Sequence, residues 1–349
     1  MSLHQLQIAQ GAVHALDQIP LHFGDQMAEY RAALYNVALL DRSHEARLRM
    51  TGSSASEILH RISTNDLRNL PHGTGRPTIL TNPNARIIDR IEVFQRTDDL
   101  LVLGEPGRGN PLRLYLRRNI FFGDEAQIDD LQPQTNQFDL HGPQAQNVIR
   151  QVAPDAAALE VMQGVEATVG GEKVYIARRK PVSEQRWTII VSAAAAAGVW
   201  SALAEAGAHP TGSLIYHVLR VRAGLPSVGR ELSDQYIPLE VGLWDEISFS
   251  KGCYTGQEII ARMESRNRLA KTIVTLQLTE LVSPPADLYA GGRAAGQLTS
   301  SVRAPDGEIF AIGVIKPDFA EPGQALEVGE KRVTAWVKGL PEGARRAAR

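Results

Sequence analysis

The sequence lacks features that mark several large classes of protein. Its 349 residues include one cysteine, Cys253. A single cysteine excludes an intramolecular disulfide, and also a zinc or iron–sulfur site built from several cysteines of one chain. The N-terminus has no basic segment followed by an apolar one, and the most apolar run, residues 191–208, is interrupted by Ser201 and Glu205. We therefore expect a cytoplasmic protein without a secretory signal or a membrane span.

An excess of charge of one sign is also lacking. Lys and Arg number 37 and Asp and Glu 39, so the net charge is −2 and argues against nucleic acid as a partner. A transfer RNA could follow a basic cluster within residues 262–271, but a solvated helix face is the commoner explanation and we prefer it. P-loop, G-x-G-x-x-G, H-E-x-x-H and nucleophile-elbow patterns are absent, and the nine histidines show no metal-ligand spacing.

The sequence is organised around residues 251–268, which read KGCYTGQEIIARMESRNR. Thr255 and Glu258 have the spacing of a capping box. The apolar residues that recur there at helical spacing are Ile259, Ile260 and Met263. This pattern predicts a short helix that begins near Gly256 and turns its apolar face inward.

Cys253 lies just before this predicted helix. The partial positive charge of a helix N-terminus favours a thiolate over a thiol, and Lys251 adds to this effect if its side chain points toward the sulfur. A lone cysteine is, however, more often a small buried apolar residue. The residues alone leave both interpretations open.

Residues 77–94 predict two strands joined by a turn at 82–84. The second strand places Asp89 on the same face as Ile87 and Ile91. An unpaired buried carboxylate is costly, so Asp89 either has a specific partner, such as an arginine or a backbone donor, or lines a ligand cavity.

Three other segments give clear patterns. Residues 46–51 alternate as in a half-buried strand, and residues 111–122 (PLRLYLRRNIFF) predict a basic-faced helix that runs into a strand. In residues 271–349, short strand-like runs are separated by Gly and Pro turns without a helix pattern. We expect a small all-β domain there, in the form of a barrel.

The contiguous stretch KGCYTGQEIIARMESR resembles the motif of the YgfZ family. Members of this family are relatives of the glycine-cleavage T-protein that bind a folate and are implicated in maturing or repairing iron–sulfur proteins. The resemblance continues upstream through RAGLPSVGRELSDQYIPLEVGLWDEISFS and downstream through GQLTSSV, with a weaker likeness to T-proteins in the N-terminal half. The motif residues are Lys251, Gly252, Cys253, Tyr254, Gly256, Gln257 and Glu258.

The resemblance implies an α+β, three-domain, cloverleaf-like T-protein fold, in which two interleaved mixed α/β units are followed by a C-terminal antiparallel β-barrel. The expected bounds are 1–45 with 138–250, 46–137, 251–270 for the cysteine motif, 271–340 for the barrel and 341–349 for a tail. It also implies tetrahydrofolate or a derivative as the cofactor, and iron–sulfur client or assembly proteins as partners.

The resemblance assigns a folate-site role to Asp89. T-proteins carry a Gly-Gly-x-x-Asp-Asp segment whose first aspartate lies beside the reacting folate nitrogens, and Asp89 matches that aspartate. Ala85 and Arg86 stand in place of the two glycines, and Arg90 replaces the second aspartate. Because the larger side chains narrow the space beside Asp89, this departure weakens the case for transferase chemistry, which needs near-attack geometry.

Two further residues are implied only by the resemblance. Glu184 matches a T-protein glutamate that holds the pterin, and an ionised carboxylate can accept the adjacent N–H donors of a pterin edge. Arg220 matches an arginine near the ligand. Without the resemblance, both would be interpreted as ordinary surface charges.

Three functions follow as hypotheses. The first is a folate-dependent accessory factor for assembly or repair of iron–sulfur enzymes, with Cys253 as a reactive or transiently ligating thiolate. A cluster needs about four ligands, so it would be shared with a partner, another protomer or a small thiol. The second is an aminomethyltransferase or demethylase of the T-protein type that uses Asp89 in catalysis. The third is a binding module in which folate is structural and Cys253 only packs.

Overall fold

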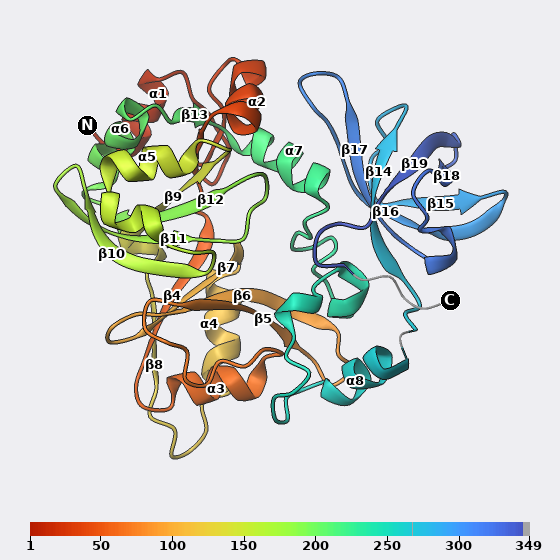
Figure 1. Ribbon diagram of the computed structural model, residues 1–349, viewed down its shortest axis with the longest axis horizontal. Helices are drawn as coiled ribbons and strands as arrows, with labels where there is room; N and C mark the ends of the chain where they lie inside the picture. The colour runs from red at the N-terminus through yellow and green to blue at the C-terminus, as the bar shows by residue number, and fades with distance from the viewer. Residues whose placement is uncertain (267, 345–349) are drawn as a thin grey trace. The chain divides into compact units, whose positions relative to one another are not determined.

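The computed structural model describes residues 1–266 and 268–344 (Figure 1). The chain forms two compact units, each built from three segments. Unit 1 contains Met1–Ile58, Leu67–Arg76 and Glu92–Tyr216, and unit 2 contains Leu59–Asp66, Pro77–Ile91 and His217–Arg349. Asn267 of the predicted motif stretch and residues 345–349 of the predicted tail lie outside the described residues. The predicted domain bounds stay a prediction.

Helices and strands are interspersed up to residue 266, and strands dominate afterwards. The helices are α1 (Leu3–Ala9), α2 (Gln26–Tyr35), α3 (Ala55–Ile62), α4 (Gly109–Arg118), α5 (Ala145–Val152), α6 (Ala196–Glu205), α7 (Ser213–Ala223) and α8 (Gln257–Arg266). The strands are β1 (Val13–His14), β2 (Pro20–His22), β3 (Ala38–Asp41), β4 (Glu45–Thr51), β5 (Gly75–Thr81), β6 (Ile87–Gln95), β7 (Leu100–Pro106), β8 (Gln127–Asp130), β9 (Thr135–His141), β10 (Gln163–Val169), β11 (Glu172–Arg178), β12 (Arg186–Ser192), β13 (His209–Thr211), β14 (Thr272–Leu278), β15 (Ala286–Ala290), β16 (Arg293–Arg303), β17 (Ile309–Ile315), β18 (Ala325–Val328) and β19 (Val333–Gly339).

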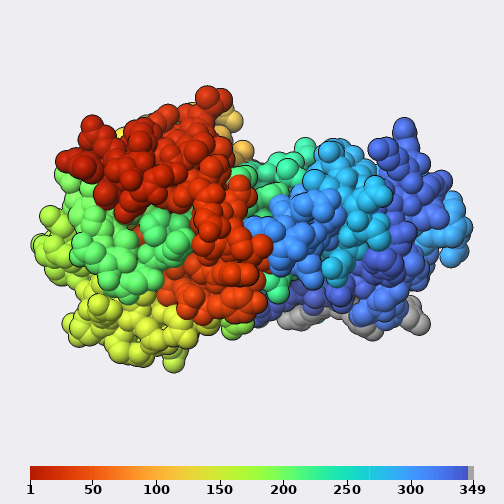
Figure 2. Space-filling model, turned by 90° about the horizontal axis from the view of Figure 1, so that it is seen from above, coloured from red at the N-terminus to blue at the C-terminus, as the bar shows by residue number. Residues whose placement is uncertain are grey.

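A six-stranded sheet forms the centre of unit 1, in the order β10-β11-β12-β9-β3-β13. Helices α5 and α6 pack on one face through a core that includes Trp187 and Trp200. The N-terminal segment lies beside α6, in red next to green in Figure 2, and Trp200 Nε1 donates to Gln10 Oε1 at 2.9 Å. The opposite face of the sheet packs on apolar residues of β6 and β7.

A second sheet has the order β5-β6-β7-β4-β8, and its strands β5 and β6 run from one unit into the other. Residues 46–51 form a strand, as predicted. The predicted alternation holds at Leu48, Arg49 and Met50, of which only Arg49 is exposed, but it is wrong at Arg47, which is buried. Arg47 is fully buried and donates to the carbonyls of Ser43, Glu45 and Thr135. These bonds explain how an arginine can take an interior position in the strand.

The strand predicted to follow the basic-faced helix is also wrong. Helix α4 ends at Arg118, and strand structure returns only at β8. The chain turns in between because Gly123 takes a φ of +92° and the Asp124 carboxylate accepts the Phe121 N–H at 2.7 Å.

The all-β prediction for the C-terminal region is confirmed. Six antiparallel strands close a barrel in unit 2, in the order β14-β17-β16-β15-β18-β19, and apolar side chains fill it. The predicted helix after the cysteine motif is confirmed as α8, with Ile260 fully buried. Among the described residues, the helices are all too short or too polar to cross a lipid bilayer.

Candidate functional site

Lys251 holds the cysteine motif inside unit 2. Its side chain is buried, and its Nζ donates to the backbone carbonyls of His60, Ser63 (2.7 Å) and Asn65 (2.8 Å). Three carbonyls match the three N–H donors of an ammonium. The Tyr254 ring centroid lies 5.2 Å from Nζ, within cation–π range, and burial raises the pKa of Tyr254 to about 12. We call Lys251 and its three carbonyls the Lys251 clamp.

The clamp uses the end of α3. Carbonyls in the last turn of a helix have no partner within the helix, and a cation there is favoured by the helix dipole. The segment after α3 is itself fixed: Thr64 Oγ1 donates to the Glu246 carbonyl at 2.7 Å, and Asn65 Nδ2 donates to the Pro77 carbonyl at 2.8 Å. The three carbonyls are therefore oriented before Lys251 reaches them.

The other end of the motif rests on the β5–β6 turn. Thr81 Oγ1 donates to the Thr255 carbonyl at 2.6 Å. Gly256 takes a φ of +86°, and a Cβ on it would lie 2.8 Å from the Ala85 Cα. Only glycine fits so close an approach in this conformation. Between the two fixed ends, Cys253 is exposed, so the interpretation of Cys253 as a buried packing residue is not supported.

Asp89 lies in β6 and is 2% exposed, with its Oδ1 accepting the Arg90 N–H at 3.0 Å. Arg90 makes a buried bidentate pair with Glu246, with N–O distances of 2.7–3.0 Å. Ala85, which stands where the T-protein pattern has glycine, takes a φ of +58°. That conformation favours glycine, which agrees with the match of Ala85 to the first glycine of the T-protein Gly-Gly-x-x-Asp-Asp segment. The catalytic role of Asp89 stays a prediction.

Arg220, in α7, contacts protein groups on several sides. Its Nη2 donates to Ser300 Oγ at 3.1 Å, its Nη1 lies 3.7 Å from Glu231 Oε2, and its Nε donates to His217 Nδ1 at 3.2 Å. Burial, followed by the charges of Arg220 and Arg230, lowers the pKa of His217 to about 4. The interpretation of Arg220 as a plain surface charge is wrong, because it is 5% exposed, whereas its folate role stays a prediction.

The predicted site residues divide between the two units. Asp89, Arg220 and the motif belong to unit 2, whereas Glu184 belongs to unit 1 and lies exposed in the bend before β12. Sequence reasoning missed the carbonyl partners of Lys251 and the Arg90–Glu246 pair. The signal available for that pair was the charge of Arg90 in a strand that has apolar residues at Ile88, Ile91 and Phe94.

Unit 1 contains a separate cluster of buried charges, which we call the unit 1 network. Its members are Arg42, Glu45, Glu92, Asp139, Arg179 and Arg186. Glu45 pairs with Arg42 (2.8 Å), Arg179 (3.1 Å) and Arg186 (3.3 Å). Burial raises the pKa of Glu45, but these arginines outweigh it and hold the pKa well below its usual value.

The network contains two more ion pairs, Arg179 with Glu92 at 2.7 Å and Arg186 with Asp139 at 2.7 Å. Three positive and three negative charges are thus balanced in the interior of unit 1. Within residues 1–266 and 268–344, His, Cys, Asp and Glu form no group that could hold a metal ion.

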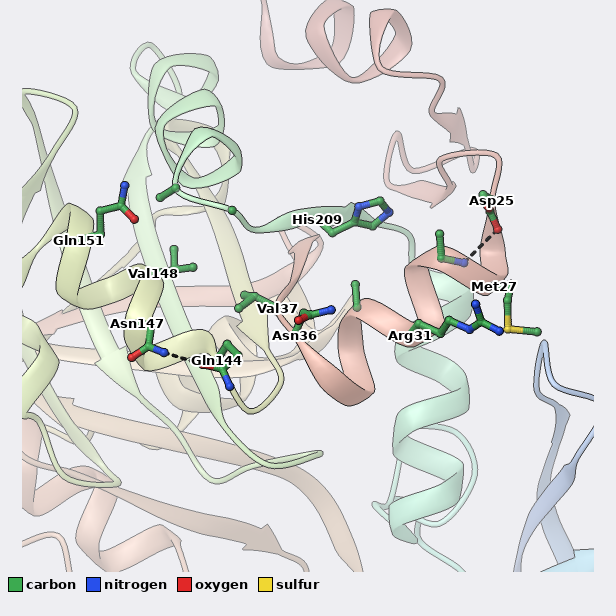
Figure 3. A pocket seen from close by; sticks show the side chains of 14 residues that line it. Asp25, Met27, Arg31, Asn36, Val37, Gln144, Asn147, Val148, Gln151 and His209 are labelled. Carbon is green, nitrogen blue, oxygen red and sulfur yellow. Dashed lines mark hydrogen bonds between the residues drawn. The ribbon is translucent and has the colours of Figure 1, made fainter.

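Two surface cavities contain none of the predicted site residues. A cavity of about 630 Å³ in unit 1 has side chains from α2 and α5 around it, among them Arg31, Asn147 and Gln151 (Figure 3). A cavity of about 780 Å³ lies beside β15 and β18 in the barrel, lined in part by Leu281 and Tyr289. The candidate site is therefore defined by the motif, Asp89 and Arg220 rather than by these cavities.

Comparison with known proteins places the fold and the family. The family model for the GCVT N-terminal domain matches residues 4–251, so Cys253 lies just beyond the match. A protein of Arabidopsis thaliana named "Putative transferase At1g60990, chloroplastic" is 30% identical over 307 residues, which cover 87% of this chain and 71% of that protein. An aminomethyltransferase of Saccharopolyspora erythraea is 27% identical over 340 residues, covering 93% of this chain and 92% of that one.

The fold agrees with a solved structure. The glycine cleavage system aminomethyltransferase T from Bartonella henselae superposes with a TM-score of 0.85 over 100% of this chain and 99% of that one, at 21% sequence identity. The predicted T-protein fold with its C-terminal barrel is confirmed. The length of the family match and the identity to the Arabidopsis relative show that this chain belongs to the GCVT family.

Proposed function

We propose that this protein is a tetrahydrofolate-binding accessory factor for assembly or repair of iron–sulfur enzymes, of the YgfZ branch of its family, and that Cys253 engages the client. The observation that carries the proposal is the Lys251 clamp. It fixes the chain two residues before Cys253, and the Thr81–Thr255 bond fixes it two residues after, while the cysteine itself is exposed. A fixed, accessible thiol suits contact with another molecule.

The buried carboxylate of Asp89 suits a folate. A carboxylate is an acceptor that can take more than one N–H donor at a time, as the adjacent N–H groups of a pterin edge require. Asp89 and Arg220, both in unit 2, would bind the cofactor, which supplies one-carbon chemistry when bound, and the pterin role of Glu184 stays a prediction. The cytoplasmic location stays a prediction, and the Arabidopsis relative is named as chloroplastic.

Folate binding is tested by titrating the purified chain with tetrahydrofolate under reducing conditions in a calorimeter. We expect saturable binding that Asp89→Asn weakens at least about tenfold, because a charged hydrogen-bond acceptor is lost. Asp318→Asn, at an exposed aspartate of the barrel, is the matched control. If the two variants bind tetrahydrofolate equally well, Asp89 is not part of the folate site. If the unaltered chain does not bind tetrahydrofolate, the folate proposal is refuted.

The accessory role is tested in cells of the source organism in which the gene is deleted. We expect the activity of iron–sulfur enzymes to fall relative to enzymes without a cluster, and the unaltered gene to restore it. Cys253→Ser should fail to restore it, whereas Ser250→Ala, in the same loop, should succeed. If Cys253→Ser restores full activity at equal protein level, the thiol has no role in the accessory function.

Aminomethyl transfer is the second candidate, and it is favoured by Asp89 and by the names of relatives such as the Saccharopolyspora aminomethyltransferase. The buried Ala85, at a position where T-proteins have glycine, weighs against it. The test is glycine synthesis or cleavage with purified partner proteins of a glycine cleavage system. Activity abolished by Asp89→Asn but retained by Cys253→Ser would favour this candidate over the accessory role.

A further inference from the structure

A pair of phenylalanines stands exposed at the tip of the turn between α4 and β8 in unit 1. Phe122 is 110% exposed and Phe121 60%, and Leu114 of α4 is 43% exposed. Single exposed apolar residues are normal on protein surfaces. Two exposed aromatic side chains in succession are less so, since aromatic residues are enriched in interfaces and usually buried elsewhere.

This turn holds its shape without help from a partner. The Asp124 N–H donates to the Phe121 carbonyl at 3.0 Å, and the Asp124 carboxylate accepts the Phe121 N–H at 2.7 Å. Gly123 supplies the positive φ that places Phe122 at the tip. We call residues 121–124 the aromatic turn.

The base of the aromatic turn is fastened to the loop after β4. The Glu125 N–H donates to Ser54 Oγ at 3.0 Å, and Ser53 Oγ donates to Glu125 Oε2 at 2.9 Å. Gly52 allows the closest approach, because a Cβ on it would lie 2.2 Å from the Glu125 carbonyl oxygen. The exposed rings are thus presented by a preorganised turn, which lowers the entropy lost on binding.

Two cations precede the rings in the chain. Arg117 and Arg118 close the last turn of α4, where they also suit the helix dipole, and both are exposed. Among the described residues, neither arginine makes an ion pair. Phenylalanine and arginine are both enriched in protein–protein interfaces relative to the rest of the surface.

We propose that the aromatic turn, with Arg117 and Arg118, docks a protein partner that has an apolar recess edged by acidic side chains. A protein fits better than an anionic membrane, because a recess can place acidic side chains beside Arg117 and Arg118 alone, whereas a uniformly anionic surface would also meet and repel Asp124 and Glu125, which follow directly after the rings. The patch is small compared with the roughly 800 Å² per partner of a standard interface, so the contact is a transient one. This proposal goes beyond the proposed function and does not depend on folate or on Cys253.

The partner is sought with p-benzoylphenylalanine, a photo-crosslinking amino acid, placed at position 122 of the full chain in cells of the source organism. The same amino acid at Leu281, an exposed apolar residue of the barrel, is the control for random contact. A protein crosslinked from position 122 but not from 281 is then purified and its affinity for the full chain is measured. Its capture alone does not count as support.

The proposal predicts that Phe122→Ser weakens this affinity at least about tenfold. Arg117→Ala with Arg118→Ala should weaken it several-fold, with a smaller salt dependence than that of the unaltered chain. Leu281→Ser should leave it unchanged. Folding of each variant is checked by its unfolding midpoint, which a tip residue without core contacts should not alter.

Several results would overturn the proposal. One is crosslinking from position 122 only to a second copy of this chain. Another is Phe122-dependent sedimentation with vesicles of phosphatidylglycerol and phosphatidylcholine, which would assign the turn to a membrane. A third is an affinity that Phe122→Ser and the arginine variants leave unchanged. The folate titration of the Phe122→Ser variant separates the outcomes, because a loss there would indicate misfolding rather than a lost docking site.

Discussion

The unit 1 network and the Lys251 clamp bury charge in opposite ways. In the unit 1 network, each buried arginine meets carboxylates, and Glu45 pairs with three of them. In unit 2, the buried ammonium of Lys251 lies among three neutral carbonyls. Removing one charged side chain from the unit 1 network leaves the charge of its partners uncompensated. Removing the ammonium of Lys251 leaves only neutral carbonyls without that donor. The comparison indicates that the network depends on charge itself, and that the clamp depends on hydrogen bonds to a loop.

The largest effect is expected from Glu45→Ala. It leaves three buried guanidinium groups with too few counter-charges, so we expect a loss of about 3–5 kcal/mol in the free energy of unfolding. Glu45→Gln should lower the free energy of unfolding by more than half of the Glu45→Ala loss, because glutamine preserves the shape of the side chain but not its charge. Urea denaturation measures both.

Glu57→Gln is the matched control, since its pair with Arg68 is about half exposed and should contribute at most about 1 kcal/mol. A Glu45→Gln variant as stable as the Glu57→Gln variant would show that the network does not depend on charge.

Lys251→Met is expected to cost about 3 kcal/mol, because it leaves buried carbonyls without donors. Lys251→Gln retains two N–H donors, so it should be more stable than Lys251→Met although it is also neutral. This differs from Glu45→Gln, where loss of the charge should account for most of the loss in stability. Denaturation of the two variants and of Lys338→Met, an exposed control in β19, tests this contrast. Equal losses for Lys251→Gln and Lys251→Met would contradict the hydrogen-bond account of the clamp.

The local patterns predicted much of the fold. The strands around residues 82–84, helix α8 and five of the six barrel strands follow from alternation, helical spacing and turn residues, which act over a few positions. The Phe121–Phe122 pair was predicted as strand because apolar aromatic residues favour strands, but the hydrogen bonds of Asp124 close a turn there. At these residues, the hydrogen bonds of the turn determine the structure, and the strand propensity of phenylalanine does not.

The partners of buried charges could not be predicted in the same way. Lys251 contacts carbonyls about 190 positions earlier in the chain, and the direction of a backbone carbonyl in a loop depends on tertiary structure. The unit 1 network joins residues from Arg42 to Arg186, each of which resembles a surface charge when considered alone. Only Asp89 could be recognised as a buried carboxylate, because Ile87 and Ile91 on the same face of its strand are apolar.

A smaller effect is expected from pH, through two histidines held neutral. Burial and then nearby arginines lower the pKa of His217 in unit 2 and of His44 in unit 1, each to about 4. The unfolded chain protonates near pH 6.5, whereas the folded groups stay neutral down to about pH 4. Stability is therefore lost as pH falls from about 6.5 to about 4.

Each histidine should account for about 2 kcal/mol of the loss between pH 7 and pH 5. His217→Gln and His44→Gln should each remove that share of the pH dependence of the unfolding free energy, and the exposed His72→Gln should remove none. If the pH dependence survives both substitutions, other groups cause the acid sensitivity of the two units.

The smallest effect is expected from Thr81→Val, which removes one neutral hydrogen bond at the other end of the motif. Valine keeps the shape and suits a strand, so only the bond to the Thr255 carbonyl is lost, at about 1 kcal/mol. Hydrogen exchange of a peptide covering residues 251–260 should speed up about fivefold. Thr168→Val, at an exposed position of β10, should change nothing.

Combining Thr81→Val with Lys251→Met tests whether the two ends of the motif act together. Independent attachments give losses that add within about 0.5 kcal/mol. A loop held as one piece gives less than the sum, because the segment is already free once Lys251 is replaced. Since Cys253 lies between the two attachments, we expect the second result, which would make the position of the thiol depend on both ends at once.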